Sequence, residues 1–269
     1  MRAVLSLCLA FATITVPALA HEYWIEAEKF QASEGQDLTA DLRVGSDLSG
    51  EAFPWLKQSF ASASLFPPDR EAAPLTGRAG DLPALRFAPE GEGLYRLAVH
   101  TTPSFVIFDD PEKFKRYVEY EGFPEVLDLH RARGLPEKGF GERFFRNARA
   151  LVQVGPVIDG QSDAPTGMPL ELVAEGNPYT PGLSEITIHL TWNGDPLPDT
   201  QVALFHAAPE AKRPDDVTRT LFSTDSDGTV TVPLQGPGLH LLSSVRIEPV
   251  EDSAVAQWQS WWASLTFAP

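Results

Sequence analysis

The residue whose type and position suggest the most specific chemistry is His21. It follows Ala18-Leu19-Ala20, and small residues at positions 18 and 20 form the A-x-A pattern at which a secretory signal peptide is cut. Cleavage after Ala20 would leave histidine first, with a free α-amine beside its imidazole. In simple peptides these groups titrate at about pH 8 and about pH 6.5, so a metal can displace both protons near neutral pH. Together they suit Ni, Co or Cu, and the sequence predicts His21 as a metal ligand.

A second ligand for such a metal is not indicated by the sequence. The other histidines are His100, His130, His189, His206 and His240, and no two are close enough in the chain to form a local metal motif. Zinc-type spacings, serine-nucleophile motifs and phosphate loops are absent, so we expect no enzyme activity. A copper oxygenase would need a second histidine and a flat substrate surface, which no pattern indicates. The alternative for His21 is that it is merely the residue that cleavage leaves first.

Residues 1–20 predict the cellular location of the protein. Arg2 precedes an apolar run that polar residues and Pro17 interrupt, which favours a cleaved signal peptide over a membrane anchor. The single cysteine, Cys8, lies within this segment, so the mature chain would have no disulfide. The net charge of -16 argues against nucleic acid as a partner. We expect an exported, periplasmic protein without a membrane span.

The remaining chain predicts an all-β fold. Residues 21–104 contain short segments of alternating polarity between turn residues, which indicates an N-terminal β-sandwich. Residues 151–269 show the same pattern and contain the hairpin signal Asn193-Gly194. About seven strands in about 100 residues is the size of an immunoglobulin-like β-sandwich. The prediction is therefore two immunoglobulin-like β-sandwich units.

The segment 105–150 is expected to be a small helical insert that joins these units. Asp110 as N-cap and Pro111 at the first helical position begin one helix, which Gly122 ends. A second helix is predicted over residues 124–133 and a third over residues 142–150.

The predicted third helix would carry a row of basic residues. Arg143, Arg146 and Arg149 recur at intervals of three, so they would share one side of the helix and pair with acids of the first helix, such as Glu119 and Glu121. A site for phosphate or carboxylate is the less favoured alternative.

Two further motifs permit more than one interpretation. Asp225-Ser226-Asp227-Gly228 resembles the start of a calcium loop but lacks the later acidic ligands, so a tight turn is favoured. Trp258, Trp261 and Trp262 could form an exposed anchor for a partner protein, although core packing is the more common role. An exposed anchor would support the alternative function, a non-catalytic interaction module of the cell envelope.

Several segments resemble a known family. They are His21-Glu22-Tyr23-Trp24-Ile25, Leu42-Arg43-Val44-Gly45, YVEYEG from Tyr117 to Gly122, RNARALVQVG from Arg146 to Gly155, and the closing segment from Trp258 to Phe267. The chain is similar to a large family of bacterial exported proteins with a domain of unknown function, commonly described as periplasmic components of nickel or cobalt uptake systems. The resemblance implies a metal ion and a membrane transporter or receptor component as partners.

The chain departs from this family at one position. Relatives often carry a histidine in the penultimate strand, where this sequence has Arg246, with His240 nearby. If that histidine is the second ligand elsewhere, the resemblance implies that metal binding is weakened or moved in this chain.

Overall fold

The computed structural model describes residues 22–211, 213–251 and 253–269. The predicted signal peptide, its cleavage site and His21 lie outside the described residues. Within them the fold is built mainly from strands, as predicted, with two α-helices. Neither described helix combines the length and the apolar character needed to span a membrane.

The elements follow one another along the chain with these bounds: β1 (Glu22–Ala27), β2 (Gln31–Ala32), β3 (Leu38–Ser46), β4 (Ser49–Phe53), β5 (Phe60–Phe66), β6 (Ala73–Pro74), β7 (Leu85–Phe87), β8 (Gly93–Thr101), β9 (Ser104–Phe108), α1 (Pro111–Tyr120), α2 (Glu125–Ala132), β10 (Phe140–Val154), β11 (Leu170–Ala174), β12 (Glu185–Trp192), β13 (Asp195–Pro196), β14 (Gln201–Ala207), β15 (Val217–Ser223), β16 (Thr229–Pro233), β17 (Leu239–Pro249) and β18 (Trp258–Phe267). Short 3₁₀ turns cover Lys57–Ser59 and Pro214–Asp216.

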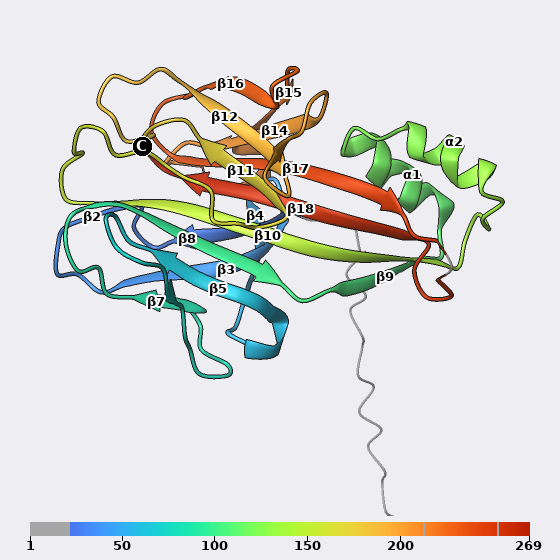
Figure 1. Cartoon of the computed structure of the whole chain (residues 1–269), viewed down its shortest axis with the longest axis horizontal. Coiled ribbons are helices and arrows are strands. Elements are labelled where there is room, and N and C mark those ends of the chain that lie inside the picture. Colours follow the sequence, from blue (N-terminus) through green and yellow to red (C-terminus); the bar gives the residue numbers. More distant parts are fainter. Residues whose placement is uncertain (1–21, 212, 252) are drawn as a thin grey trace, which may run out of the picture.

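The described strands form three sheets. The first sheet has the order β1-β3-β4, with β7 also on β3. The central sheet has the order β15-β14-β17-β18-β10-β8-β5-β6, with β2 and β9 also on β10. The third sheet has the order β11-β12-β13, with β16 on β12. In Figure 1 the long strands β10, β17 and β18 run across the middle of the molecule, and the two helices lie at one end.

Strand β10 joins the early and late parts of the chain in the central sheet. It pairs in parallel with β18 over residues 142–150, and antiparallel with β8 over residues 151–154. Near its start it also pairs antiparallel with β9. Strands from before residue 104 and after residue 200 thus share one hydrogen-bonded sheet.

The alternation of side chains along β18 shows how the layers are arranged. Trp262 stacks on Tyr117 of α1, and the next residue on the same face, Ser264, contacts the backbone of β1. On the opposite face, Trp261 packs edge-on against Trp192 of the third sheet, with ring centroids 4.5 Å apart. Because successive side chains of a strand point to opposite faces, the first sheet and α1 cover one face of the central sheet, and the third sheet covers the other.

The two predicted helices are confirmed, but the predicted third helix is wrong. The side chain of Asp110 accepts a hydrogen bond from the amide of Glu112 at 3.0 Å and caps α1 as expected. Residues 142–150 lie instead in β10. Layers cover β10 on both faces, and a segment buried on both faces lacks the alternation that marks a half-buried strand. The three-residue arginine spacing therefore gave a false helical signal.

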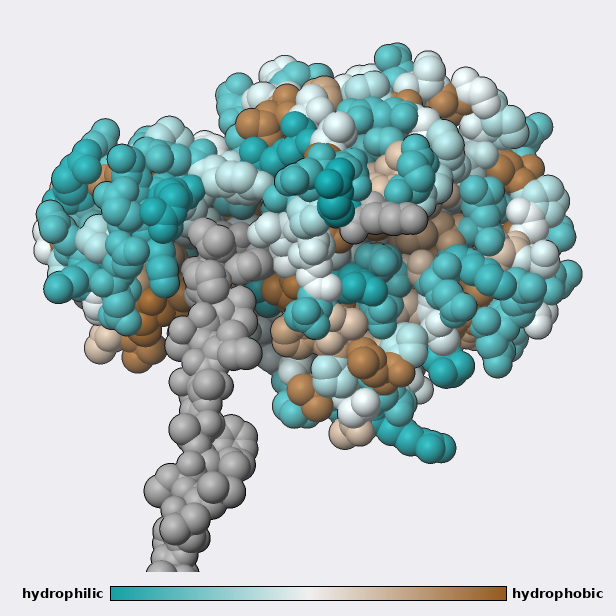
Figure 2. Space-filling model, turned by 180° about the vertical axis from the view of Figure 1, so that it is seen from behind, coloured by the Kyte–Doolittle hydropathy of each residue, from teal (hydrophilic) through white to brown (hydrophobic). Residues whose placement is uncertain are grey.

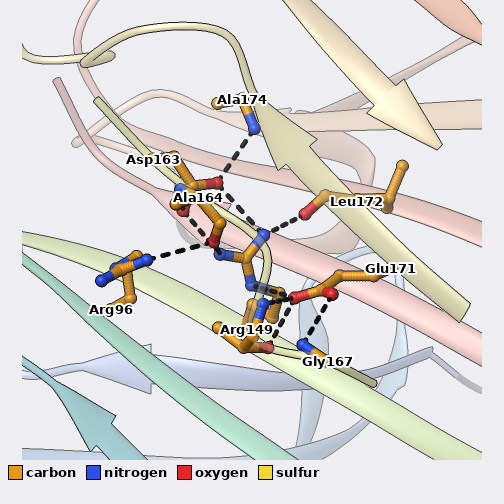
Figure 3. Close-up of polar contacts among 9 residues, drawn as sticks. Arg96, Arg149, Asp163, Ala164, Gly167, Glu171, Leu172 and Ala174 are labelled. Carbon is orange, nitrogen blue, oxygen red and sulfur yellow. Dashed lines mark hydrogen bonds and ion pairs between the residues drawn. The ribbon is translucent and has the colours of Figure 1, made fainter. Parts of the chain in front are cut away.

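The arginines of this segment do not pair with Glu119 and Glu121. Arg149 points into the interface with the third sheet, where Figure 3 shows its guanidinium between two carboxylates. Its Nη2 lies 2.5 Å from Asp163, and its Nε lies 3.2 Å from Glu171. All three side chains are almost fully buried. Arg149 also donates to the backbone carbonyls of Leu172 and Ala164, so this ion cluster connects β10 to β11 and the segment before it.

Two of the open interpretations are resolved by the fold. Asp225 accepts hydrogen bonds from the amides of Asp227 and Thr229 at 3.0 and 2.9 Å, so its carboxylate closes a tight turn. Trp258, Trp261 and Trp262 are no more than 9% exposed, so the three rings belong to the core. The face seen in Figure 2 is mainly hydrophilic, with small separate hydrophobic patches, as expected from a chain with 37 acidic residues.

Candidate metal site at the start of strand β1

Two buried carboxylates lie near each other where β1 begins. Glu22 is the first residue of β1 and is paired with Gly45 of β3, and it is 3% exposed. Glu121 directly follows α1 and is 5% exposed. The charge of Glu22 raises the pKa of Glu121, so the ionisation of the two carboxyl groups is linked.

The position of Glu121 is set by the way α1 ends. Gly122 has a φ of 87°, the left-handed conformation that commonly follows a helix. A side chain at this position would also meet Gln201 of β14, whose Oε1 would lie 2.9 Å from the added Cβ. Gln201 in turn donates a hydrogen bond to the carbonyl of Tyr120 at 2.9 Å. The helix end is therefore held against β14, and Glu121 is held near β1.

One oxygen of each carboxylate has no hydrogen-bond partner in the part of the chain that the structure describes. Among the residues that the structure describes, neither Oε2 of Glu22 nor Oε1 of Glu121 has a hydrogen-bond donor, although both atoms are buried. A buried polar atom without a partner costs free energy, and a buried charge costs more unless it is neutralised. A proton or a cation at these oxygens would therefore stabilise the folded protein.

Burial controls the ionisation of both groups. Burial raises the pKa of Glu22 to about 7. A hydrogen bond from the backbone amide of Glu22 lowers this pKa, the charge of Asp47 raises it, and the charge of Arg219 lowers it. The pKa of Glu121 is raised well above its usual range, first by burial and then by the charge of Glu22, with Arg219 again lowering it. Near neutral pH the pair holds protons that a bound cation would replace.

Arg219 is a basic group whose charge acts on both glutamates, and it makes its contacts elsewhere. Its guanidinium carbon lies 3.7 Å from the centre of the Tyr120 ring, and its Nη2 donates to the Tyr120 carbonyl at 2.9 Å. Within the described part of the chain, Arg219 forms no ion pair with either glutamate. The charge of Arg219 thus lowers the pKa of both glutamates, but its guanidinium does not bind their carboxylates.

The five internal histidines all have other partners. His100 pairs with Asn147 at 2.7 Å, His130 accepts from the Trp258 indole at 3.0 Å, and His189 contacts Glu175 at 3.3 Å. The rings of His206 and His240 lie 4.6 Å apart, and both bond to nearby backbone groups. In residues 22–211, 213–251 and 253–269, no group of three or more histidines and acids is arranged to hold a metal.

Arg246, where relatives often carry histidine, is also engaged. It bonds to Glu248 and lies over the Trp192 ring, with the guanidinium carbon 4.9 Å from the ring centre. It therefore faces the third sheet, whereas Glu22 and Glu121 lie on the side of the first sheet and α1.

Carboxylate oxygens are among the ligands that divalent transition metals accept, so Glu22 and Glu121 are compatible with such a metal. Glu22 is joined to His21 by one peptide bond, and its carboxylate, with that of Glu121, offers partnerless oxygens. An amine, an imidazole and carboxylates form a mixed nitrogen and oxygen donor set that Ni, Co and Cu accept. The sequence patterns did not indicate Glu22 or Glu121 as candidate ligands. One signal was available for Glu121, since a carboxylate at the negative end of a helix is unfavourable without compensation.

Comparison with known proteins identifies a family whose description assigns no function. No curated protein matches the chain. A family model, described as a domain of unknown function (DUF4198), matches residues 18–248. Since this match covers most of the sequence, the chain belongs to the DUF4198 family of domains of unknown function.

Proposed function

We propose that this is an exported periplasmic protein that binds a divalent transition metal, Ni, Co or Cu, and assists its uptake by a membrane transporter or receptor component. The α-amine and imidazole of His21 hold the metal, and the carboxylates of Glu22 and Glu121 complete its coordination. Export follows from the predicted cleavage after Ala20, which frees that amine. The protein acts as a carrier and not as an enzyme.

One observation carries this proposal. Two nearly fully buried carboxylates, one of them adjacent in sequence to His21, each keep an oxygen without a partner among the described residues. Their raised pKa values express the cost of ionising them without a cation. A metal ion would supply the positive charge that this pair lacks.

The test is titration calorimetry with Ni²⁺, Co²⁺ and Cu²⁺. One protein begins at His21, and a second has a single alanine before His21, which removes the free histidine amine but keeps every side chain. We expect the extended chain to bind at least about tenfold more weakly, because one of its nitrogen ligands is lost. Equal affinities would exclude the terminal chelate.

A second pair of variants tests the carboxylates. Glu121→Gln keeps the shape of the side chain but removes its charge, and it should weaken binding by about tenfold or more. Glu142→Gln is the matched control, because Glu142 is also buried and also has a partnerless oxygen, but lies in the cluster around Tyr117. It should bind metal as the original chain does.

We also propose a fold type for the C-terminal part of the chain. We regard residues 151–269 as an immunoglobulin-like β-sandwich, because β11, β12 and β16 face β14, β17 and β18 across a shared core that includes Leu172, Leu204 and Leu265.

The alternative function, a non-catalytic interaction module of the cell envelope, lacks support from Trp258, Trp261 and Trp262, whose rings are buried.

A further inference from the structure

A cavity of about 180 Å³ lies between the first sheet and strands β5, β8 and β10. Its walls combine apolar side chains, among them Leu42, Val44, Leu56 and Phe60, with the hydroxyl-bearing residues Ser59, Thr101, Thr102 and Ser104. Arg146 is the one charged residue that lines it, and no acidic residue of the described chain does. The cavity thus combines apolar and hydroxyl-bearing walls with a single positive charge.

No acidic side chain of the described residues pairs with the charge of Arg146. Within residues 22–211, 213–251 and 253–269 it forms no ion pair and no side-chain hydrogen bond, and its Nε is buried without an acceptor. Its guanidinium carbon lies 4.8 Å from the centre of the Phe144 ring and 5.5 Å from that of Tyr23. Aromatic faces hold the group in place but leave its hydrogen-bond donors free.

Two other arginines show what is missing here. Arg149 follows Arg146 by an odd number of residues on the same strand, so it faces the opposite side of β10, where it bonds to two carboxylates. Arg246 also lies over an aromatic ring, that of Trp192, and it is paired with Glu248. Burial lowers the pKa of Arg146 to about 10, so its guanidinium stays charged at neutral pH without a counter-ion from the described chain.

We infer that this cavity binds a small monocarboxylate with a short apolar tail. The carboxylate would accept two hydrogen bonds from the planar guanidinium of Arg146, the geometry that this group favours. The tail would lie against Leu42, Val44 and Leu56. A volume of 180 Å³ corresponds to about six water molecules at about 30 Å³ each, which suits an acid of a few carbon atoms.

This site is separate from the proposed metal site. Tyr23 lines the cavity, whereas Glu22 precedes it on β1, and neighbouring side chains of a strand point to opposite faces. A single positive charge disfavours metal cations, and it offers too little charge for a phosphate dianion. A short carboxylate matches both the charge and the walls.

The test compares ligands on the unaltered protein by titration calorimetry. Butyrate should bind, and butyramide, which has the same shape without the charge, should bind at least about tenfold more weakly. Acetate should also bind more weakly than butyrate, by about threefold to fourfold for each methylene removed. Equal binding of butyrate and butyramide, no heat with butyrate, or tighter binding of inorganic phosphate would overturn the proposal.

Two variants then assign the charge to one residue. Arg146→Gln should weaken butyrate binding by at least about tenfold. Arg246→Gln removes the same charge from an arginine that also lies on an aromatic ring, and it should leave butyrate binding unchanged. Retained binding in Arg146→Gln, or equal loss in both variants, would refute the assignment. Because the ligand comparison needs no variant, the proposal stays testable even if Arg146→Gln fails to fold.

Discussion

The hydroxyl of Ser264 donates a hydrogen bond to the backbone carbonyl of Tyr23 at 2.7 Å. Two residues further along each strand, Thr266 donates in the same way to the carbonyl of Ile25 at 2.5 Å. Strand β1 pairs with β3 on one edge, and on its other edge these hydroxyls of β18 take the place of a neighbouring strand. The last strand of the chain therefore fixes the position of the first, and with it the position of Glu22.

Removing one of these hydroxyls should loosen β1. Ser264→Ala leaves the buried Tyr23 carbonyl without its donor, so we expect a loss of about 1 to 3 kcal/mol in the free energy of unfolding. Urea denaturation followed by tryptophan fluorescence would measure it. Thr187→Val is a suitable control, since Thr187 bonds to Thr231 on the exposed face of its sheet, and its effect should stay within about 0.5 kcal/mol.

The cluster around Arg149 predicts a larger effect. Arg149→Met removes the cation and leaves Asp163 and Glu171 buried together, so we expect a loss of about 3 to 5 kcal/mol in the free energy of unfolding. The same denaturation experiment applies. Arg131→Ala breaks an exposed pair with Asp128 and should cost less than about 1 kcal/mol. A loss in Arg149→Met as small as that in Arg131→Ala would show that the cluster contributes little to stability.

Stability should fall as the pH rises because of Glu142. This carboxyl accepts hydrogen bonds from Tyr117 and Ser260 in the apolar cluster beside α1, and burial, opposed by these two bonds, raises its pKa from 4.5 to about 7. Between these values the folded state holds a proton that the unfolded state has lost, so the free energy of unfolding decreases with pH. The decrease amounts to about 3 kcal/mol and is complete above about pH 7.

Measuring this effect requires urea denaturation at several pH values with Glu142→Gln as the comparison. The variant cannot ionise at this position, so its stability should fall less steeply between pH 4.5 and 7. Some slope should remain, since Glu22 and Glu121 also have raised pKa values. Parallel curves for the two proteins would contradict the buried-carboxyl explanation.

Metal binding should have the opposite dependence on pH. Since Glu22 has a pKa of about 7 and must lose its proton to bind a cation, affinity should rise from pH 6 to pH 8 by about tenfold per pH unit for each proton released. Calorimetry in buffers of different ionisation enthalpy would count those protons. Glu22→Gln should bind more weakly and release fewer protons, whereas an unchanged proton count would exclude Glu22 as a ligand.

The strands and both helices could largely be predicted from local patterns. The capping aspartate Asp110 and the turn at Asp225 act on backbone groups within a few residues, so their effects are visible in the sequence nearby. Strand β10 was missed because its neighbours are far away in the chain. Its parallel partner β18 begins more than a hundred residues later, and no local pattern shows that layers will cover both of its faces.

The candidate site was harder to predict for the same reason. Glu22 and Glu121 are separated by almost a hundred residues, and each belongs to a segment with many other acids. What distinguishes them is burial, which depends on the docking of α1 against β14 through Gln201. The predicted cleavage site directed attention to His21, but neither it nor the family resemblance indicated these two carboxylates.

The contact between the first and the last strand also bears on the order of folding. Thr266 and Ile25 are 241 positions apart, and the parallel pairing of β10 with β18 likewise needs the final residues of the chain. Contacts between distant segments form late, because closing a long loop costs entropy before any contact compensates for it. The protein can therefore complete its core only after β18 (Trp258–Phe267) is free to fold.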